Sequence, residues 1–432
     1  MPRRPNILLF LMDGVQASAL DPGSACITPN FDRLRESGLL FRRAYTATPV
    51  CSPARASLLT GTLPHNHGVL EVEHGRDADQ CNLRTNLPHW PQRLQANGYT
   101  NAYFGKWHVE RTNCLENFGW TINRCKASEH HAFLGQGKDG GADLDIDPKL
   151  CRYVEGPPGY NRVLHYGVTD VSPDQRYPSF TVNQAQEFIA SNTNSESPWT
   201  ACVSFSEPNE SLVVSRSTFE QYDVSKTPLP VNLNDDLADR PNIYQRQRAI
   251  SKDVTADEWR MARTCYYGRI TELDVQFGRL YRQLEESGQL RDTVIIVTAD
   301  HGRYVGAHGF DAHNFGAFEE IYRIPLIMAG PEIASGLETH GLVNFHDLCP
   351  TILELTGSEP ITIPDSKSFT ALLTSPEDAR QEFNTAYGEY HGTRFCLSQR
   401  ILWRDNWKFV FNGFDFDELY DLANDPHEMT NL

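Results

Sequence analysis

Val294-Ile295-Ile296-Val297-Thr298-Ala299 is an apolar, mostly β-branched run that ends at the polar residues Asp300-His301-Gly302. Three other segments share this form, a short apolar run followed at once by polar residues. They are residues 7–12 before Asp13-Gly14, residues 99–104 before Gly105-Lys106-Trp107-His108, and residues 200–205 before Ser206-Glu207-Pro208-Asn209. Near-continuous apolar runs of this length are typical of strands buried on both faces of a parallel sheet. The sequence therefore predicts a parallel sheet that contains these strands.

Segments between these runs have the composition and spacing of helices. Short helices are expected over residues 30–37 and 87–97, each followed by a glycine. A longer helix starts after Thr255, where Glu258 completes a capping box, and keeps apolar residues at helical spacing until Gly288. Strands that alternate with helices predict an α/β fold with a mostly parallel central sheet.

The pattern changes after a glycine-capped helix expected over residues 347–357. Residues 395–402 and 407–411 then have the character of antiparallel strands. We therefore expect a catalytic α/β domain over residues 1–357. A smaller C-terminal subdomain, an antiparallel sheet packed on that domain, is expected over residues 358–432.

Two long segments, residues 110–180 and 207–254, are rich in Gly, Pro, Asp and Asn and have little periodicity. Long segments of this kind in compact domains are usually functional or disordered. We expect them to form the rim that shapes the substrate site.

Composition places limits on the partners of the chain. Its 432 residues are 40% hydrophobic and 22% charged, as in ordinary globular proteins, and the formal net charge is −17. That charge argues against nucleic acid or an anionic membrane surface as a partner. The cysteines are scattered without a CxxC pair, residues 7–12 are too short for the core of a signal peptide, and no run approaches transmembrane length. We therefore expect a cytoplasmic protein with reduced thiols.

Polar side chains follow each of the expected strands. Because the carboxyl ends of parallel strands meet at one edge of a sheet, where ligands bind, these side chains indicate one site. An unpaired carboxylate after a buried strand is costly, so Asp13 and Asp300 need a cationic partner. The sequence predicts that Asp13, Asp300 and His301 are ligands of one divalent cation. The alternative is that each aspartate is a turn residue or a helix cap, which is common.

Cys51-Ser52-Pro53-Ala54-Arg55 has the form of a helix start. Pro53 suits the first turn, where its missing N–H is not needed, and Gly61 can close the helix. Cys51 then lies at the N-terminal end, where the helix dipole favours negative charge, and Arg55 can reach the same place from the next turn. The arrangement predicts an anion site, and the alternative is a buried structural cysteine.

The stretch over residues 51–55 resembles the sulfatase family, in which Cys-x-Pro-x-Arg directs the conversion of the cysteine to formylglycine. Further motifs of that family occur in family order along nearly the whole chain. They are Asp13, Gly105-Lys106-Trp107-His108, Asp300-His301-Gly302, Glu319-Glu320-Ile321-Tyr322-Arg323-Ile324-Pro325-Leu326 and Glu418-Leu419-Tyr420-Asp421-Leu422. The resemblance implies an alkaline-phosphatase-like sandwich and the hydrolysis of a small aryl, alkyl or sugar sulfate.

The same resemblance implies a role for each matching residue. The hydrated formylglycine made from Cys51 would attack sulfur, and its second hydroxyl would allow sulfate to be expelled afterwards. Arg55 would hold the formylglycine, Lys106 would bind the sulfate oxygens, and His108 would take the proton of the hydrate as the covalent intermediate collapses.

The implied cofactors are formylglycine at position 51 and one divalent cation, to which an oxygen of that residue is a further ligand beside Asp13, Asp300 and His301. The resemblance implies Ca²⁺. Here, however, Gly14 stands where most members have a second aspartate, and His301 stands where many have asparagine. Fewer carboxylate oxygens and an imidazole favour Mn²⁺ or Zn²⁺. The implied protein partner is a maturation enzyme that makes formylglycine.

Two substrate-binding positions also depart from the family pattern. Asn209 stands where members have a histidine, and it can form hydrogen bonds but cannot deliver a proton. His313 stands where a sulfate-binding lysine is expected. We expect both residues to bind substrate. We further expect His313, with an unperturbed pKa suited to proton transfer, to be a catalytic acid that compensates for the two changes.

Two other functions stay open at this point. The missing second aspartate is shared with phosphonate monoester hydrolases and choline sulfatases, so the chain could be a phosphonate monoester or phosphodiester hydrolase with the same nucleophile. It could also be a catalytically degenerate member that binds an anion or a protein, since family positions are substituted. The intact residues 51–55 and Lys106-x-His108 argue against the degenerate member.

Overall fold

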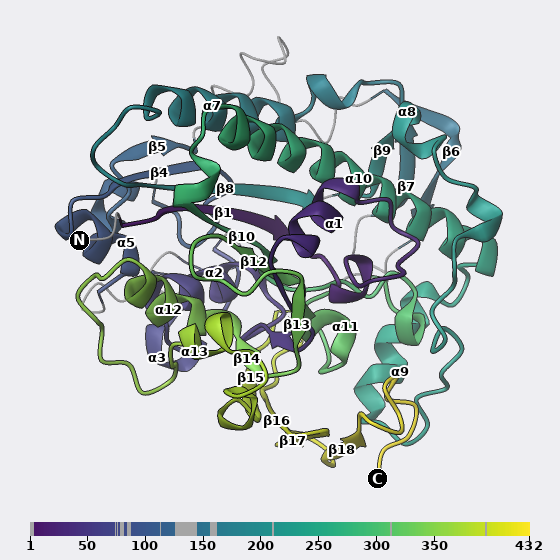
Figure 1. Ribbon diagram of the computed structural model, residues 1–432. Helices are drawn as coiled ribbons and strands as arrows, with labels where there is room; N and C mark the ends of the chain where they lie inside the picture. Colours follow the sequence, from purple (N-terminus) through teal and green to yellow (C-terminus); the bar gives the residue numbers. More distant parts are fainter. Residues whose placement is uncertain are drawn as a thin grey trace.

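An eight-stranded sheet forms the centre of the molecule (Figure 1). The structure, a computed structural model, describes residues 4–73, 75, 77, 82–83, 88–112, 114–125, 145–155, 162–209, 211–311, 313–393 and 395–432. In their order across the sheet, the strands are β13 (Leu337–Thr339), β2 (Leu39–Phe41), β12 (Leu326–Ala329), β10 (Thr293–Ala299), β1 (Asn6–Asp13), β8 (Trp199–Pro208), β4 (Thr100–Gly105) and β5 (Ile122–Arg124).

The runs predicted as strands are neighbours at the centre of this sheet. β10, β1, β8 and β4 are parallel to one another. Ile7 of β1 pairs with Val294 of β10 on one side and with Thr200 of β8 on the other. The pairings of β12 with β10 and with β2 are antiparallel. The prediction of a mostly parallel α/β sheet is confirmed, and its strand ends meet at one edge.

Helices cover both faces of the sheet, as a sandwich requires (Figure 1). On one face lie α1 (Pro29–Glu36), α7 (Tyr177–Ser191) and α10 (Ala256–Glu286), and on the other α2 (Cys51–Thr60), α5 (Trp90–Ala96) and α12 (Leu348–Leu355). Side chains of β1 alternate between the two layers: Phe10 belongs to the first core, and Leu9 and Leu11 belong to the second.

The predicted helices are present with small changes of boundary. α10 begins at the predicted capping box, in which the Thr255 side chain accepts from the Glu258 N–H. The helix expected over residues 87–97 is α5, although Leu87 itself lies outside the described residues. The shorter helices are α3 (Pro64–His67), α8 (Arg216–Phe219), α9 (Asn242–Arg248), α11 (Glu319–Tyr322) and α13 (Thr370–Thr374). No helix within the described ranges has both the length and the apolar character of a membrane span.

Two small sheets lie beside the central one. One is made of β11 (Arg323–Ile324), β3 (Ala44–Tyr45) and β14 (Val343–Asn344), the other of β6 (Ile146–Val154), β7 (Val163–Thr169) and β9 (Val213–Ser215). The second sheet falls within the segments expected to be irregular. Most residues of β6 are only partly buried, so its hydrophobic pattern is weak. It nevertheless pairs with β7.

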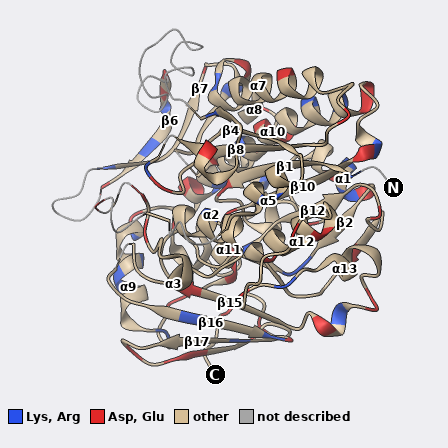
Figure 2. Cartoon of the chain, turned by 90° about the vertical axis from the view of Figure 1, so that its left-hand side faces the viewer, with Lys and Arg blue, Asp and Glu red and all other residues tan. Residues whose placement is uncertain are grey.

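The C-terminal strands form a separate antiparallel sheet, visible at the lower edge of Figure 2. It contains β15 (Thr385–Tyr390), β16 (Gln399–Arg404), β17 (Trp407–Asn412) and β18 (Glu418–Asp421), which pair in this order. The prediction of a C-terminal antiparallel sheet is confirmed. β16 begins later than predicted because the Leu397 N–H donates to the carbonyl of Phe395 in a turn. The division of the chain at residue 357 stays a prediction.

Candidate active site

The ends of the central strands place the predicted site residues. Asp13 is the last residue of β1, and Asp300 and His301 follow β10 directly. Lys106 and His108 follow β4, and Asn209 follows β8. Helix α2 begins at Cys51 beside this edge, and its C-cap is Gly61 with φ of 72°, as predicted.

Arg55 joins the two predicted carboxylate ligands. Its Nε lies 2.7 Å from Oδ2 of Asp300, and its Nη2 lies 3.3 Å from Oδ2 of Asp13. The Nη1 donates to Oγ of Ser204 at 2.7 Å. Burial would lower the pKa of Arg55, but Asp300 and Asp13 outweigh burial and raise it. Arg55 therefore stays charged and positions both aspartates from the interior side of the site.

The remaining carboxylate oxygens face a common point together with His301 and Cys51. Nε2 of His301 lies 3.5 Å from Oδ1 of Asp13 and 3.7 Å from Oδ1 of Asp300. Sγ of Cys51 lies 3.1 Å from the same Nε2. The candidate ligand atoms of Asp13, Cys51, Asp300 and His301 all lie within 4.8 Å of one another, and all four residues are buried.

The hydrogen bonds of His301 prepare its ring for a cation. Nδ1 lies 2.8 Å from the carbonyl oxygen of Gly302, so this nitrogen carries the proton and donates it. Nε2 then faces the two Oδ1 atoms, at 3.5 and 3.7 Å. Histidine ligands of metals usually have their second nitrogen fixed by such a donor contact. Two carboxylates and this imidazole form a donor set that fits a divalent cation.

The two buried carboxylates have pKa values shifted in opposite directions. Burial would raise the pKa of Asp13, but Lys106, His301 and Arg55 outweigh burial and hold this pKa well below its usual range. Burial and the charge of Asp13 raise the pKa of Asp300. A negative charge on Asp300 is therefore less favourable than one on Asp13, because the positive side chains do not fully compensate both charges.

Cys51 is not an anion as an unmodified thiol. It is 3% exposed, and burial together with the charge of Asp13 raises the pKa of its thiol well above the ordinary value. Burial and the charge of Asp13 outweigh the stabilisation that the dipole of α2 would give to a thiolate. The thiol is therefore protonated at neutral pH, and the anion site predicted at the start of α2 is not made by a thiolate.

Lys106 lies in the site, as predicted. Its Nζ is 2.5 Å from Oδ2 of Asp13, and its carbonyl accepts from Arg55 Nη1 at 3.2 Å. His108 is partly buried two residues further on and has a positive φ of 47°, which turns the chain sharply after β4. Its predicted role in proton transfer stays a prediction.

His313 lies against the site, but its expected pKa is wrong. Its ring stacks on that of His301 with centroids 4.0 Å apart, and its Nδ1 lies 3.0 Å from the carbonyl oxygen of Pro49. Burial and the neighbouring His301 lower the pKa of His313 well below the ordinary value. The ring is thus neutral at neutral pH, with its proton on Nδ1, and Nε2 is an acceptor. This environment therefore disfavours the protonated form of His313 that a catalytic acid requires.

Two of the departures from the family pattern are neighbours in space. Gly14 has φ of +75°, and a Cβ placed on it would lie 3.0 Å from Cβ of Asn209. The Asn209 carbonyl accepts from Nη1 of Arg303 at 2.6 Å, and its side-chain Oδ1 lies 3.3 Å from the same atom. Asn209 is therefore fixed by Arg303, and position 14 has no room for a larger residue without a shift.

Sequence reasoning missed several residues that support the site. Ser204 holds Arg55, and Arg303 holds Asn209. Asp311 lies 3.5 Å from Nη2 of Arg303 and 3.2 Å from Nδ1 of His165. The closeness of Arg303 to Asp300-His301 in the sequence was a usable signal. Asp311 follows eight residues after Arg303 but belongs to no recognisable motif, and His165 comes from a distant segment.

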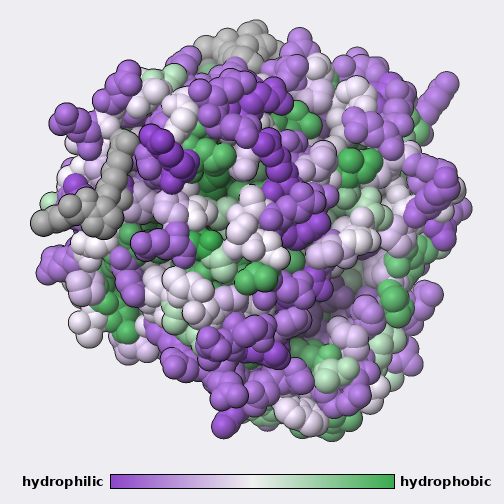
Figure 3. Space-filling view, in the orientation of Figure 1, coloured by the Kyte–Doolittle hydropathy of each residue, from purple (hydrophilic) through white to green (hydrophobic). Residues whose placement is uncertain are grey.

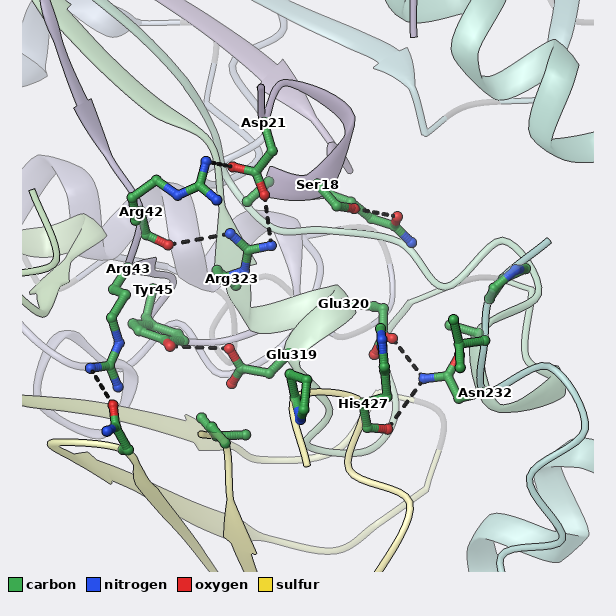
Figure 4. A pocket seen from close by; sticks show the side chains of 18 of the residues that line it. Ser18, Asp21, Arg42, Arg43, Tyr45, Asn232, Glu319, Glu320, Arg323 and His427 are labelled. Atoms are coloured by element: carbon green, nitrogen blue, oxygen red, sulfur yellow. Dashed lines mark hydrogen bonds and ion pairs between the residues drawn. The ribbon is translucent and has the colours of Figure 1, made fainter. Parts of the chain in front are cut away.

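A cavity of about 550 Å³ lies apart from these residues (Figure 4). Its lining residues come from 16–45, 229–340 and 406–427, and none of them is a predicted site residue. Polar groups there are paired with each other: Asp21 lies 3.2 Å from Arg42 and 3.1 Å from Arg323. The candidate active site is therefore the strand-end cluster and not this cavity.

Comparison with known proteins identifies the family of this chain. Residues 5–358 match the family described as Sulfatase, and residues 306–432 match the one described as N-sulphoglucosamine sulphohydrolase, C-terminal. The chain is 28% identical over 436 residues to the uncharacterized sulfatase YidJ of Escherichia coli, covering 100% of this chain and 83% of that protein.

Two further proteins are similar over the whole chain. The choline-sulfatase of Rhizobium meliloti is 27% identical over 448 residues, covering 99% of this chain and 82% of that protein. The crystal structure of a phosphonate monoester hydrolase of Agrobacterium radiobacter has a TM-score of 0.80 at 23% identity, covering 99% of this chain and 91% of that one. The last likeness confirms the alkaline-phosphatase-like fold.

Proposed function

The chain belongs to the sulfatase family of the alkaline phosphatase superfamily, whose members are sulfuric ester hydrolases, and we propose that Cys51, converted to formylglycine, is its nucleophile. A hydrated aldehyde carries two hydroxyl groups on one carbon. One can form the bond to sulfur as the alcohol leaves, and the other allows the C–O cleavage that releases sulfate. The observation that carries the proposal is the 3.1 Å approach of Cys51 Sγ to His301 Nε2 inside the buried cluster with Asp13 and Asp300.

Asp13, Asp300 and His301, with an oxygen of the converted residue 51, would hold one divalent cation. When bound, the cation supplies positive charge that stabilises negative charge developing at position 51. The imidazole ligand and the glycine at position 14 favour Mn²⁺ or Zn²⁺, whereas the family resemblance favours Ca²⁺.

The side chains around this cluster have distinct tasks in the proposal. Lys106 Nζ lies 2.5 Å from Oδ2 of Asp13, where it can neutralise charge on the sulfate oxygens. His108 takes the proton of the hydrate when sulfate is released. Arg55 is a positioning residue, because its donors are already engaged by Asp13, Asp300 and Ser204.

His313 and Asn209 border the substrate in this proposal. Neutral His313 offers an acceptor at Nε2, so it orients the substrate or a water molecule and does not donate a proton. Asn209 shapes the site through its contact with Arg303. The leaving-group proton then comes from elsewhere, which favours substrates with a good leaving group, such as aryl sulfates.

Peptide mass spectrometry over residues 51–55, on protein made in a cell that has the maturation enzyme, tests the nucleophile. We expect the mass of an aldehyde in place of the thiol, together with turnover of an aryl sulfate that the Cys51→Ala variant lacks. Unmodified cysteine in a fully active preparation contradicts the proposal. Ser52→Ala is the matched control, because it leaves Cys51, Pro53 and Arg55 in place.

A second candidate is the hydrolysis of phosphonate monoesters or phosphodiesters by the same residues. It is favoured by Gly14, which removes one carboxylate from the cation site and lowers the negative charge facing the substrate. Comparison of kcat/KM for an aryl sulfate and an aryl phosphonate monoester separates the two. Family membership disfavours the degenerate, non-catalytic alternative.

A further inference from the structure

The outward face of the C-terminal sheet is apolar. Large side chains on it are between 39% and 50% exposed, and we call this set the aromatic face. Its members are Leu402, Trp407, Phe409 and Phe411 of the sheet, together with Phe414 and Phe416 of the turn between β17 and β18. Hydrophobic residues reach the surface in the lower part of Figure 3, where the C-terminal sheet lies in Figure 1. Contiguous apolar surface of this kind marks an interaction site.

The pattern of β17 shows that the exposure is not caused by a frayed strand. Trp407, Phe409 and Phe411 point outward, while Lys408 and Val410 between them are fully buried. A strand with one buried face normally carries polar residues on the other face. Here the outer side of β17 carries only aromatic residues, and the aromatic face therefore needs a cover of its own.

Both edges of the sheet are already occupied by the chain itself. At β15, the Tyr387 N–H donates to Oδ1 of Asn344 at 3.0 Å, and the Glu389 N–H donates to the carbonyl of Ala47 at 2.7 Å. At β18, the Leu419 N–H donates to Oδ1 of Asn431 at 2.8 Å, and the Leu419 carbonyl accepts from the Leu432 N–H at 3.0 Å. A partner therefore meets the face of this sheet and not its edges.

Charges flank the aromatic face in a specific order. Arg404 of β16, Trp407 of β17 and Asp421 of β18 form one row across the sheet. In the next row, Phe409 stands between Leu402 and Leu419. Arg404 is exposed, and no ion pair joins it to another residue of the described part of the chain. The face is positive on one side of β17 and negative on the other.

We propose that the aromatic face binds a second copy of this chain about a two-fold axis parallel to β17. Such a rotation places β16 of one copy over β18 of its partner. Trp407 and Phe409 then meet their own counterparts, and Arg404 lies over the partner's Asp421. An isologous interface requires this self-complementarity, and sheets that pack face to face keep their strands within about 30° and lie about 10 Å apart.

The size of the face determines how stable this dimer is. Four strands about 4.8 Å apart, with up to six residues at about 3.4 Å each, give a face of about 20 Å by 20 Å. Two such faces, one from each copy, bury about 800 Å² in total, and the turn that carries Phe414 and Phe416 brings this near the lower limit of about 1,000 Å² for specific interfaces. We therefore expect a dimer that dissociates on dilution.

Sedimentation velocity of the full chain over a hundredfold range of micromolar concentration tests the proposal. We expect the apparent mass to approach twice that of the monomer at the high end. Phe409→Lys places a charge on an exposed position and is expected to give a monomer throughout. Val275→Lys, on a 49% exposed apolar residue of α10, is the matched control and is expected to dimerise like the wild type. Turnover of a small aryl sulfate, equal in all three proteins, verifies that they are folded.

A charge swap tests the two-fold arrangement itself. Arg404→Asp and Asp421→Arg are each expected to weaken the dimer at least tenfold, and the double variant is expected to restore it. Because Asp421 also accepts from Ala423 and Asn424, thermal unfolding of its variants is measured, and Arg404→Glu serves as a second single variant. If the double variant dimerises more weakly than either single variant, the proposed axis is wrong.

Other occupants of the aromatic face give different results. A wild type that is monomeric at every concentration overturns the proposal. Monomeric wild type that binds heparin, with binding lost in Phe409→Lys, assigns the face to a sulfated polymer and also overturns it. Dimers that persist unchanged in Phe409→Lys place the interface elsewhere.

Discussion

Arg55 and Asp300 form a buried ion pair, with Arg55 Nε 2.7 Å from Asp300 Oδ2 and exposed fractions of 1% and 0%. The pair ties the first turns of α2 to the end of β10, two elements separated by more than half of the chain. Through the same guanidinium, Asp13 at the end of β1 is held as well. The geometry of the proposed cation site therefore depends on a helix residue that is not itself a ligand.

Replacement of Arg55 is expected to damage stability and activity together. Arg55→Met leaves the buried Asp300 without its arginine partner and leaves Asp13 with Lys106 alone. We expect the free energy of unfolding to fall by about 3–5 kcal/mol. Urea denaturation measures this loss. Arg260→Met is the control, because its pair with the 93% exposed Asp257 is a surface contact worth at most about 1 kcal/mol. A loss for Arg55→Met no larger than that of the control contradicts the positioning role.

Removal of divalent cations is expected to abolish turnover without unfolding the protein. Asp13, Asp300 and His301 are already held by Arg55, Lys106 and Gly302, so the site keeps its form when a chelator takes the cation. We expect Mn²⁺ or Zn²⁺ to restore more activity than Ca²⁺ at equal concentration, because an imidazole replaces an oxygen ligand. Assays after dialysis against a chelator measure this. Full activity in the chelated protein excludes a catalytic cation.

His313→Ala is expected to lower kcat/KM for an aryl sulfate and for an unactivated alkyl sulfate by the same factor, about tenfold, or about 1.4 kcal/mol. The reason is that neutral His313 orients a group through Nε2 and gives no proton to the leaving oxygen. Parallel kinetics on the two esters provide the test. A much larger loss for the alkyl sulfate would instead identify His313 as the catalytic acid.

Gly14→Ala is expected to destabilise the protein more than Gly288→Ala. Both glycines have positive φ, +75° and +70°, and a side chain in that region costs about 1–2 kcal/mol. A Cβ at Gly288 meets nothing within 4 Å, whereas one at Gly14 meets Asn209 at 3.0 Å. Thermal unfolding of both variants isolates the cost of the contact. Equal losses in the two variants contradict the steric coupling of Gly14 with Asn209.

Glu389 is expected to contribute to stability in a pH-dependent way. Burial alone would raise its pKa, but hydrogen bonds from His391 and from the His65 N–H lower it to about 2. Its contribution, on the order of 3 kcal/mol, is therefore present above about pH 4.5 and lost as the pH falls towards 2.

Unfolding of Glu389→Gln by urea between pH 7 and pH 2.5 tests this linkage. The variant is expected to be less stable at pH 7 and to lose less stability on acidification than the wild type. Glu359→Gln, at a 71% exposed carboxylate paired with Arg93, is the control and is expected to follow the wild type. Identical pH profiles for Glu389→Gln and the wild type refute the assignment.

Much of the fold could be predicted from local pattern. The predicted apolar runs, residues 7–12, 99–104, 200–205 and 294–299, form most of the adjacent central strands β1, β4, β8 and β10, because strands buried on both faces must be apolar along most of their length. The closeness of Asp13, Asp300 and His301 followed from the same reasoning, since polar residues just after such strands share one edge. β6 could not be predicted, because most of its residues are only partly buried and show no clear alternation.

Sequence alone determined which chemical groups are available and that Asp13, Cys51, Asp300 and His301 lie at strand or helix ends, since these features depend on neighbours along the chain. Only the tertiary structure decided the protonation and the partners of those groups. His313 is neutral because it is buried against His301, Arg55 supports two carboxylates from the interior side of the site, and Asn209 is fixed by Arg303. Electrostatic energy depends on burial and on distances between residues far apart in the chain, and no local pattern records either quantity.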